Sequence, residues 1–352
     1  MALSLHLDPS QIKKVLVIKL RAIGDVLLST VVTKNLREAY PQAAIDFLTE
    51  RPNRDVLVGN KYIDEIIVFD RSPANGLKVL FDLRRRKYDL VIDLFGNPRS
   101  ALMTFASGAK YRVGYAFRGR KYAYNVRVKP RGDSVHNTEF NLDALRAVGV
   151  GVTDRSIHFP LTPESEEFAS RFLGNRHSRG RMLVALNPSG GWYTKRWRLE
   201  QYAALGDRIA EKFGADVLLI WGPGEYKDTE ALKSMMHHEA LMPPATDLKE
   251  LGALLKECSL LVTNDSGPMH IAAAVGTPVV AIFGPTSPRL QGPHGNKHVV
   301  VRNESLDCLE CNLTKCPIGN ICMTELTVGD VMAGVEKLLA ETSIKSSTPM
   351  NA

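Results

Sequence analysis

The sequence predicts an α/β protein made of two doubly wound halves. Short runs rich in Val, Ile and Leu alternate with stretches of helical apolar spacing, and glycine or proline turns separate them. This alternation occurs twice, on either side of a polar stretch at 149–163. The 352 residues, 44% hydrophobic and 24% charged, suffice for two cores. We therefore expect a parallel sheet covered by helices in each half.

The first half begins with an apolar run at 14–20, which is too short for a helix and typical of a buried parallel strand. A turn at 21–25 leads into helical apolar spacing at 26–40, which Pro41 ends. A strand at 44–48 completes a βαβ unit. The same patterns then predict a strand at 65–69, a helix at 75–87, a strand at 90–94 and a helix at 137–148.

The second half repeats the alternation after the polar stretch. Its predicted elements are, in order, helix 164–173, strand 181–187, helix 199–213, strand 216–221, helices 227–236 and 247–257, strand 259–263, helix 269–275 and strand 279–283. We assign 1–165 to an N-terminal domain and 166–340 to a C-terminal domain. The last helix, at 328–339, is a candidate to pack back on the first domain, and the polar tail at 341–352 is expected to be disordered.

The charge of the chain is concentrated in the first half. Residues 1–160 carry 26 Lys and Arg against 16 Asp and Glu, whereas residues 161–352 carry 19 against 22. Thirteen of these cations lie within 80–131. Such a segment attracts an anionic lipid, a phosphorylated glycan or a nucleic acid, or it is a solvated surface. No nucleic-acid-binding motif accompanies it, so nucleic acid is not the expected partner.

The segment 19–25 (KLRAIGD) ends the first predicted strand. It holds one glycine where a dinucleotide fingerprint needs three, which argues against a nicotinamide cofactor. Asp25 remains as a carboxylate at the strand-to-helix turn. It either caps the helix or serves as a general base that the helix N-terminus keeps ionised, and both interpretations stay open.

Two turns of the second half have the composition of phosphate sites. In the first, Ser189 and Gly190 allow backbone N–H groups to approach an anion, and Thr194 with Lys195 follows just before a helix. An ordinary glycine-rich turn is the alternative.

The second turn, 263–270 (TNDSGPMH), places Asp265, Ser266 and Gly267 at a helix N-terminus, where free N–H groups favour a diphosphate. His270 lies on the first helical turn and either donates to the same anion or is structural.

Two further groups have more than one interpretation. Glu225 follows a strand and a glycine turn, as an acidic ribose ligand does, although a surface turn has the same pattern. Cys308, Cys311, Cys316 and Cys322 are close enough in sequence for a structural zinc ion or two disulfides. No signal peptide and no apolar run of about 18 residues is found, so we expect a cytoplasmic protein without a transmembrane segment. Disulfides are disfavoured there, which leaves zinc or reduced thiols.

Together these segments resemble glycosyltransferase family 9, the lipopolysaccharide heptosyltransferases. The resemblance rests on 19–30, 195–197, 264–270 and 308–322, and the segments 19–30 and 136–139 look most like the subgroup labelled heptosyltransferase III. It implies a GT-B fold, in which two Rossmann-like domains face a central cleft. It also implies an inverting reaction, with the acceptor on the N-terminal domain and ADP-L-glycero-D-manno-heptose on the C-terminal one.

The resemblance also implies roles for single residues. Asp25 matches the family's proposed base, and Lys195 matches the lysine at the donor phosphates, which would act without a catalytic metal or other cofactor. The remaining donor-binding candidates are Ser189, Gly190, Thr194, Glu225, Asp265, Ser266, Gly267 and His270. Family members usually have threonines where this chain has Ser189 to Trp192, which leaves the donor sugar open.

The implied acceptor, the lipopolysaccharide core on lipid A, is an anionic glycolipid of the inner membrane. Arg21, Arg118, Arg120 and Lys121 are the candidates to bind it, and cationic attraction would make the protein peripheral to the membrane's inner face. Three alternatives remain: a family member with another donor or glycan acceptor, a sugar-nucleotide epimerase or hydrolase, and a non-catalytic protein that binds anionic surfaces.

Overall fold

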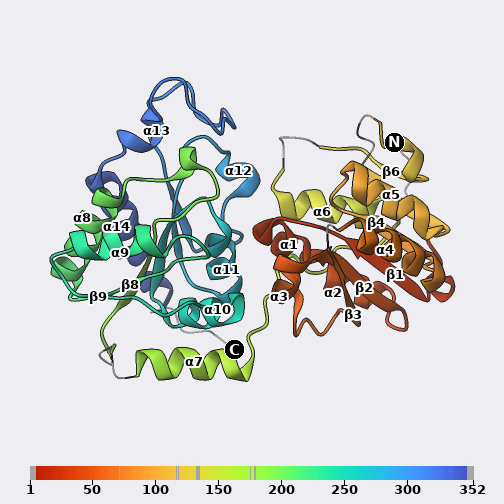
Figure 1. Ribbon diagram of the computed structural model, residues 1–352, viewed down its shortest axis with the longest axis horizontal. Coiled ribbons are helices and arrows are strands. Elements are labelled where there is room, and N and C mark those ends of the chain that lie inside the picture. Colours follow the sequence, from red (N-terminus) through yellow and green to blue (C-terminus); the bar gives the residue numbers. More distant parts are fainter. Residues whose placement is uncertain are drawn as a thin grey trace. The chain divides into compact units, whose positions relative to one another are not determined.

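The computed structural model describes residues 5–70, 72–115, 117, 119–131, 135–174, 176–177 and 180–346. The chain divides into two compact units, Met1–Pro160 and Leu161–Ala352. Each unit contains one six-stranded sheet covered by helices (Figure 1). The strand pairs are parallel in both sheets. The α/β class predicted from the sequence is confirmed.

The first sheet has the order β3-β2-β1-β4-β5-β6. Its strands are β1 Lys14–Ile18, β2 Ala44–Glu50, β3 Glu65–Phe69, β4 Leu90–Asp93, β5 Tyr111–Tyr115 and β6 Val126–Val128. Its helices are α1 Ile23–Ser29, α2 Val31–Ala39, α3 Arg54–Leu57, α4 Pro73–Arg86, α5 Pro98–Ser107 and α6 Asn137–Arg146. Val79 and Leu83 of α4 and Met103 of α5 join Leu16 and Val91 of the sheet in one buried cluster, so α4 and α5 cover the same face.

The second sheet has the order β12-β11-β10-β7-β8-β9, which is the same topology in its own numbering. Its strands are β7 Leu183–Asn187, β8 Asp216–Leu219, β9 Ala240–Leu241, β10 Leu260–Asn264, β11 Val279–Ile282 and β12 His298–Val301. Its helices are α7 Pro163–Leu173, α8 Leu199–Phe213, α9 Tyr226–Met235, α10 Leu248–Glu257, α11 Gly267–Val275, α12 Pro288–Gln291, α13 Ile321–Thr324 and α14 Val328–Ser346. Every residue of β7 and β10 is buried, as central parallel strands require.

The helix expected at 26–40 is two helices, α1 and α2, which meet at Thr30. The Thr30 hydroxyl donates to the Leu27 carbonyl at 2.7 Å and accepts from the His158 N–H at 2.8 Å. Ser29 likewise donates to the Val26 carbonyl. Hydroxyls that bond back to the preceding turn bend or interrupt helices, which accounts for the break.

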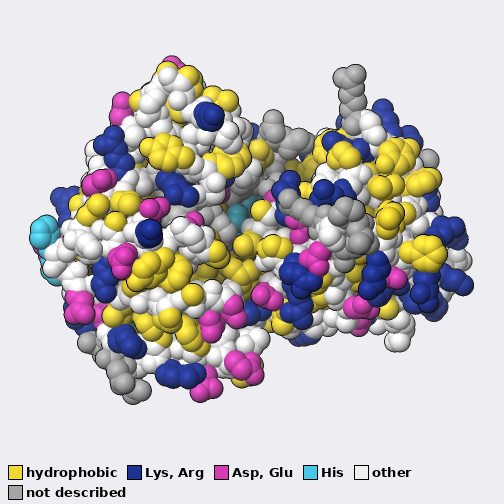
Figure 2. Space-filling view, viewed as in Figure 1, with side chains coloured by type: hydrophobic (Ala, Val, Ile, Leu, Met, Phe, Trp, Pro, Cys, Tyr) yellow, Lys and Arg dark blue, Asp and Glu magenta, His cyan; other side chains and the backbone are white. Residues whose placement is uncertain are grey.

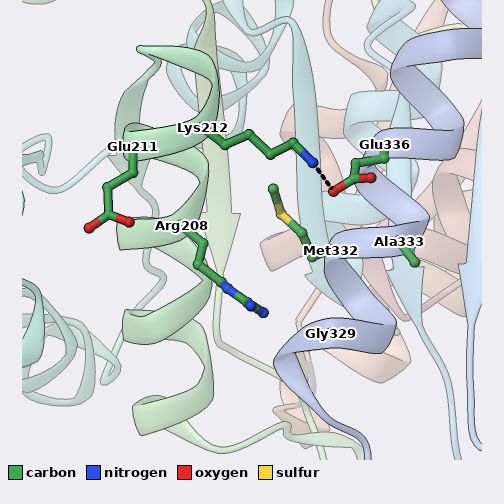
Figure 3. A pocket seen from close by; sticks show the side chains of 7 residues that line it. All are labelled: Arg208, Glu211, Lys212, Gly329, Met332, Ala333 and Glu336. Carbon is green, nitrogen blue, oxygen red and sulfur yellow. Dashed lines mark hydrogen bonds and ion pairs between the residues drawn. The ribbon is translucent and has the colours of Figure 1, made fainter.

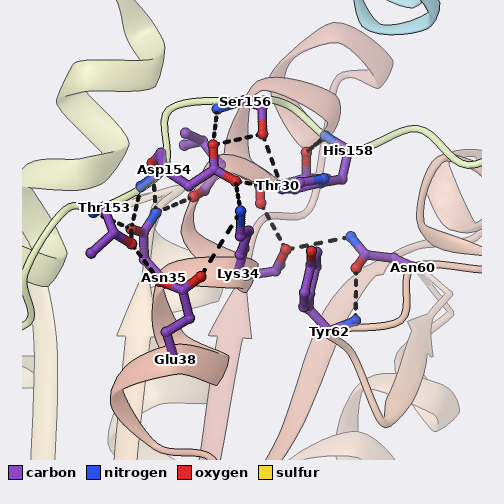
Figure 4. Close-up of polar contacts among 12 residues, drawn as sticks. Thr30, Lys34, Asn35, Glu38, Asn60, Tyr62, Thr153, Asp154, Ser156 and His158 are labelled. Atoms are coloured by element: carbon purple, nitrogen blue, oxygen red, sulfur yellow. Dashed lines mark hydrogen bonds and ion pairs between the residues drawn. The ribbon is translucent and has the colours of Figure 1, made fainter. Parts of the chain in front are cut away.

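The polar stretch before α7 is bound to the first unit (Figure 4). Asn35 accepts from the N–H groups of Thr153 and Asp154 at 2.8 and 3.1 Å and donates to the Asp154 carbonyl at 2.8 Å. Lys34 Nζ lies 3.0 Å from Asp154 Oδ2. By contrast, α7 contacts α10 of the second unit. The chain therefore passes from one unit to the other between 160 and 161.

The last helix, α14, packs on β11, β12 and α8 of the second unit. Val331, Val335 and Leu338 are buried in the second core. Between α8 and α14 lies an open pocket of about 530 Å³, and Lys212 Nζ reaches Glu336 Oε1 at 2.7 Å beside it (Figure 3). The helix continues to Ser346, so the first part of the tail expected to be disordered is helical, and 347–352 lie outside the described residues. No described helix is long and apolar enough to cross a membrane.

Candidate functional site

The loops after β7 and β10 are neighbours at the carboxyl edge of the second sheet. These two strands pair directly, and the strand order reverses between them. Parallel α/β sheets bind ligands at such a switch point, because the loops on either side leave in opposite directions. The two turns predicted from the sequence as phosphate sites follow these two strands.

Asn187 and Asn264, the last residues of β7 and β10, hold the two loops together. Asn264 is fully buried, and its Nδ2 donates to the carbonyls of Pro188 and Ser189 at 2.8 and 3.1 Å. Its Oδ1 accepts from the Trp197 N–H at 3.1 Å. Asn187 Nδ2 donates to the Ser266 hydroxyl at 2.9 Å. These amides fix the backbone of both loops before any ligand arrives.

Lys195 and Asp265 form an ion pair at this edge. Lys195 Nζ lies 2.6 Å from Asp265 Oδ2, and the two side chains are 14% and 6% exposed. The same oxygen accepts a hydrogen bond of 2.7 Å from the buried Thr286 hydroxyl. Lys195 also lies over the Trp192 ring, 4.6 Å from its centroid. Asp265 thus orients the lysine, and a second anion near Nζ would share its positive charge.

The N-terminus of α11 follows Asp265 directly in sequence, and Ser266, Gly267 and Pro268 are partly exposed. Its N-cap, Ser266, has an extended backbone and makes no side-chain capping bond, and Pro268 lies in the first turn. The first N–H groups of a helix carry partial positive charge and point away from the helix, so they can bind phosphate oxygens. His270 is buried on the first turn, 6% exposed.

The loop after β7 leads from Ser189 to Arg196 and borders a pocket of about 510 Å³. Arg196 Nε donates to the Gly190 carbonyl at 2.8 Å, which closes the loop on itself. The Thr194 hydroxyl, a candidate donor ligand, instead donates to the Leu313 carbonyl at 2.8 Å. Thr194 therefore connects this loop to the cysteine segment.

Glu225 caps the turn in which it lies. Its Oε2 accepts from the Gly222 N–H at 2.8 Å, and α9 begins at the next residue. This bond uses one acceptor position of the carboxylate, so both of its oxygens can still accept hydrogen bonds. The turn follows β8, the neighbour of β7, at the same edge of the sheet.

Asp25 lies in the first turn of α1, after β1 at the carboxyl edge of the first sheet. It is half-buried, and its Oδ2 accepts from the Ala22 N–H at a long 3.4 Å. Among the described residues, no cation lies within ion-pair distance of its carboxylate. The two interpretations from the sequence are compatible in this geometry, because a weak capping bond leaves the carboxylate able to accept a proton.

Lys19, which the sequence analysis did not select, stands beside this turn. Its Nζ donates to the Leu94 carbonyl at 3.1 Å and so connects the ends of β1 and β4, where the first sheet has its switch point. The residue before Leu94, the fully buried Asp93, accepts hydrogen bonds from the N–H groups of Phe95 and Gly96 at 2.9 Å. Burial raises the pKa of Asp93, and these hydrogen bonds act against that rise.

The candidate acceptor residues are not gathered at one point. Arg21 is exposed after β1, whereas Arg120 and Lys121 follow β5, two strands away. The guanidinium of Arg120 lies over the Phe117 ring, 5.9 Å from its centroid. Arg118 lies outside the described residues.

The zinc site considered for the four cysteines is not formed among the described residues. Cys322 belongs to the second core, where its sulfur packs against Gly284, while Cys311 is exposed. The four thiols are free. Burial, together with the neighbouring thiols, raises the pKa of Cys322 to about 11.

Several site residues had no signal strong enough to select them. Asn187 and Asn264 were visible only as polar residues at the ends of apolar strands, and Thr286 as part of a glycine-proline turn. Their partners are 67 to 79 residues away for the asparagines and 21 for Thr286. Only the pairing of the strands brings them together.

The chain was compared with known proteins. The sequence model of glycosyltransferase family 9 (heptosyltransferase) matches residues 77–322, well over half of the chain. Lipopolysaccharide heptosyltransferase 3 of Escherichia coli is 27% identical, over 93% of this chain and 100% of that protein. A family 9 glycosyltransferase of Veillonella parvula has a TM-score of 0.86 at 24% identity, over 96% of this chain and 99% of the other.

Escherichia coli heptosyltransferase WaaC, solved with ADP, has a TM-score of 0.72 at 20% identity and covers 92% of this chain and 99% of its own. The matches agree in family and fold along nearly the whole chain. The chain therefore belongs to glycosyltransferase family 9 and is a glycosyltransferase of the GT-B fold.

Proposed function

We propose that this glycosyltransferase moves heptose from ADP-L-glycero-D-manno-heptose to the inner core of lipopolysaccharide, with inversion at the anomeric carbon. The single observation that carries the proposal is the cluster at the β7 and β10 switch point, where Lys195 lies beside the open N-terminus of α11. A cation and free N–H groups fit the diphosphate of a nucleotide sugar. Likeness to heptosyltransferase 3 along its full length supports heptose as the sugar.

In the proposed reaction, the Asp25 carboxylate takes the proton from an acceptor hydroxyl while that oxygen attacks the anomeric carbon. The bond from this carbon to the ADP oxygen breaks, and ADP leaves with its diphosphate charge. Attack on the face opposite the leaving group inverts the anomeric carbon. A carboxylate without a cation partner suits this task, because an ion pair would weaken it as a base.

Lys195 and the α11 N-terminus would stabilise ADP as it leaves. Negative charge grows on the diphosphate as the bond breaks, so fixed positive groups bind the transition state more strongly than the donor. Asp265 would hold Lys195 in place through its side chain, and Thr286 would act through Asp265. Ser189 and Gly190 would add backbone N–H groups from the neighbouring loop, with His270 behind the α11 N-terminus and Glu225 at the ribose.

The acceptor side of the proposal uses the first unit. Lipid A with its inner core is anionic, and Arg21, Arg118, Arg120 and Lys121 are the cations proposed to bind it. A protein that glycosylates this lipid would work at the inner face of the inner membrane, and it would do so as a peripheral protein. The surplus of cations in residues 1–160 supports this location.

The test has two steps on the purified full chain. Calorimetric titration with ADP, UDP and GDP should give selective binding of ADP, weakened in Lys195→Ala and unchanged in Lys212→Ala, which removes an exposed lysine of the same unit. Incubation with ADP-heptose and a heptose-deficient lipopolysaccharide should then add the mass of one heptose. Preference for UDP or GDP would rule out ADP-heptose, and ADP binding without transfer would rule out the acceptor.

A further inference from the structure

The helices α4 and α5 carry exposed apolar side chains on their outer side. Of the twelve large hydrophobic side chains that the described residues expose, five lie on α4, α5 and the short turn Lys121–Ala123. Leu77 and Phe81 are each 72% exposed, and Leu102, Phe105 and Tyr122 are 46%, 52% and 54% exposed. We call these five residues the α4–α5 surface. Figure 2 shows hydrophobic side chains bordered by Lys and Arg over these helices.

These side chains lie on elements that contact one another. The helices pack on each other, and the Arg84 guanidinium of α4 lies against Gly108 at the end of α5. The two helices follow β3 and β4 of the same parallel sheet, so they run in the same direction. The Phe105 and Tyr122 rings contact edge to face at 5.7 Å.

The core does not need these residues. The inner sides of the two helices already supply Val79, Leu83 and Met103, which are 5%, 0% and 2% exposed, to the cluster on the sheet. Leu77 and Phe81 lie one helical turn apart on the opposite side of α4. A contiguous exposed apolar patch of this kind marks an interaction site, because hydrating it costs free energy without any gain in folding.

The cations around the surface are not neutralised by the protein. Lys78, Arg84, Arg85, Lys110 and Lys121 are all exposed, and among the described residues no carboxylate lies within 4.0 Å of their nitrogens. Other arginines of the same unit do have acidic partners; Arg37, Arg51 and Arg86 contact carboxylates at 2.5 to 2.6 Å. The acid on α4 is Asp82, which is half-buried. Positive charge therefore borders the apolar side chains.

We propose that the α4–α5 surface docks this protein on a bilayer that contains anionic phospholipids. Apolar side chains would enter the boundary between headgroups and acyl chains, while the cations contact lipid phosphates. A second copy fits less well, since a symmetric contact would bring two sets of unpaired cations together. The proposal deepens the peripheral location given above, but it needs neither the donor nor the acceptor to be identified correctly.

The test is co-sedimentation of the full chain with vesicles of phosphatidylethanolamine and phosphatidylglycerol, and with vesicles of phosphatidylcholine alone. We expect binding to the anionic vesicles that salt weakens. The double variant Leu77→Ser, Phe81→Ser should bind at least about tenfold more weakly, because it removes the apolar contact. The double variant Lys78→Glu, Arg85→Glu should also bind the anionic vesicles about tenfold more weakly at low salt. Met235→Ser, an exposed apolar change on α9, should bind like the wild type.

Three results would overturn the proposal. The first is absence of binding by the wild type, and the second is equal binding by the serine variant. The third is a wild-type dimer in sedimentation velocity that the serine variant converts to monomer, which would assign the surface to a second copy. Far-UV circular dichroism of each variant shows whether it is folded, and calorimetric titration with ADP shows whether the donor site of the second unit is intact. Failed docking with normal ADP binding would therefore leave the proposed reaction standing.

Discussion

Replacing Lys195 with methionine leaves the Asp265 carboxylate without its cation in a place that water hardly reaches. Methionine keeps most of the length and apolar stem of lysine, so the change mainly removes the charge. In the wild type, Lys195 Nζ and Asp265 Oδ2 are 2.6 Å apart and Asp265 is 6% exposed. The Thr286 hydroxyl remains as the neighbouring donor to the same oxygen in the variant.

The size of the effect follows from this geometry. At 2.6 Å and an effective dielectric constant of about 20, the attraction is about 6 kcal/mol before the cost of desolvating both charges. Removing one partner of a buried pair costs about 3–5 kcal/mol, because the other charge stays buried. We expect the lower end, about 3 kcal/mol, since Thr286 still donates. For a unit as long as Leu161–Ala352, that loss lowers Tm by about 6–12 °C.

Tryptophan fluorescence measures this loss in the correct unit. The three tryptophans of the chain, Trp192, Trp197 and Trp221, all lie in the second unit. Thermal and urea unfolding followed by their emission therefore report on that unit alone. The matched control is Lys212→Met, because Lys212 pairs with Glu336 at 2.7 Å but both side chains are about half exposed. An exposed pair of this kind contributes less than about 1 kcal/mol.

A double-mutant cycle decides whether the ion pair is the cause. Adding Asp265→Asn to Lys195→Met removes the buried carboxylate charge. The double variant should therefore lose about 2–3 kcal/mol less unfolding free energy than the two single variants lose together. The reasoning is refuted if Lys195→Met loses no more than Lys212→Met, or if the two single losses add. ADP should also raise Tm less in Lys195→Met than in the wild type, because the diphosphate loses its cation.

Three further outcomes are expected. Asp25→Asn should slow heptose transfer by about 10²–10⁴-fold while calorimetric ADP affinity stays within about twofold, because a general base contacts only the acceptor; unchanged turnover would remove Asp25 from that role. Thr286→Val should destabilise the second unit by about 1.5–3 kcal/mol in the same fluorescence assay and raise KM for the donor, since Asp265 loses a charge-assisted hydrogen bond; wild-type values for both would contradict the positioning role. Partial burial acts to raise the pKa of Asp154, but hydrogen bonds from Ser156 and Lys34 lower it to about 2, from an ordinary 3.8. The ionised carboxylate therefore contributes its full stabilisation above about pH 4, and this contribution is lost as the pH falls toward 2. Asp154→Asn should therefore cost about 1–2 kcal/mol at pH 7, measured by hydrogen exchange of α2, and this difference should shrink on acidification; a difference independent of pH would contradict the ion pair.

The strands at the centre of each sheet could be predicted because their residues are buried on both faces. Continuous apolar runs located β1, β4, β7 and β10 to within a few residues. The strands β5 and β6 were missed, since β5 contains Arg112 and is only partly buried, and β6 is three residues long at the edge of the sheet. An edge strand makes fewer apolar contacts, so its sequence carries less of the pattern.

In the candidate site, too, local features could be predicted and contacts between distant residues could not. Turns with glycine, proline or an acidic residue after an apolar strand are local features, and they predicted the segments that hold Asp25, Lys195 and Asp265. The use of each side chain is not local. The Thr194 hydroxyl donates a hydrogen bond to the Leu313 carbonyl, 119 residues away, whereas the sequence predicted a contact with the nucleotide sugar.

The sequence by itself therefore determined the fold class, the family and the loops that carry charged residues, because periodicity and turn chemistry act over a few residues. Only the tertiary structure decided that Lys195 meets Asp265, 70 residues away, that Asn264 holds the loops after β7 and β10 together, and that the neighbouring helices α4 and α5 both expose apolar side chains. Each of these depends on which strands pair and which helix sides face the sheet. That choice is made by burial of the whole core, which no short segment of sequence contains.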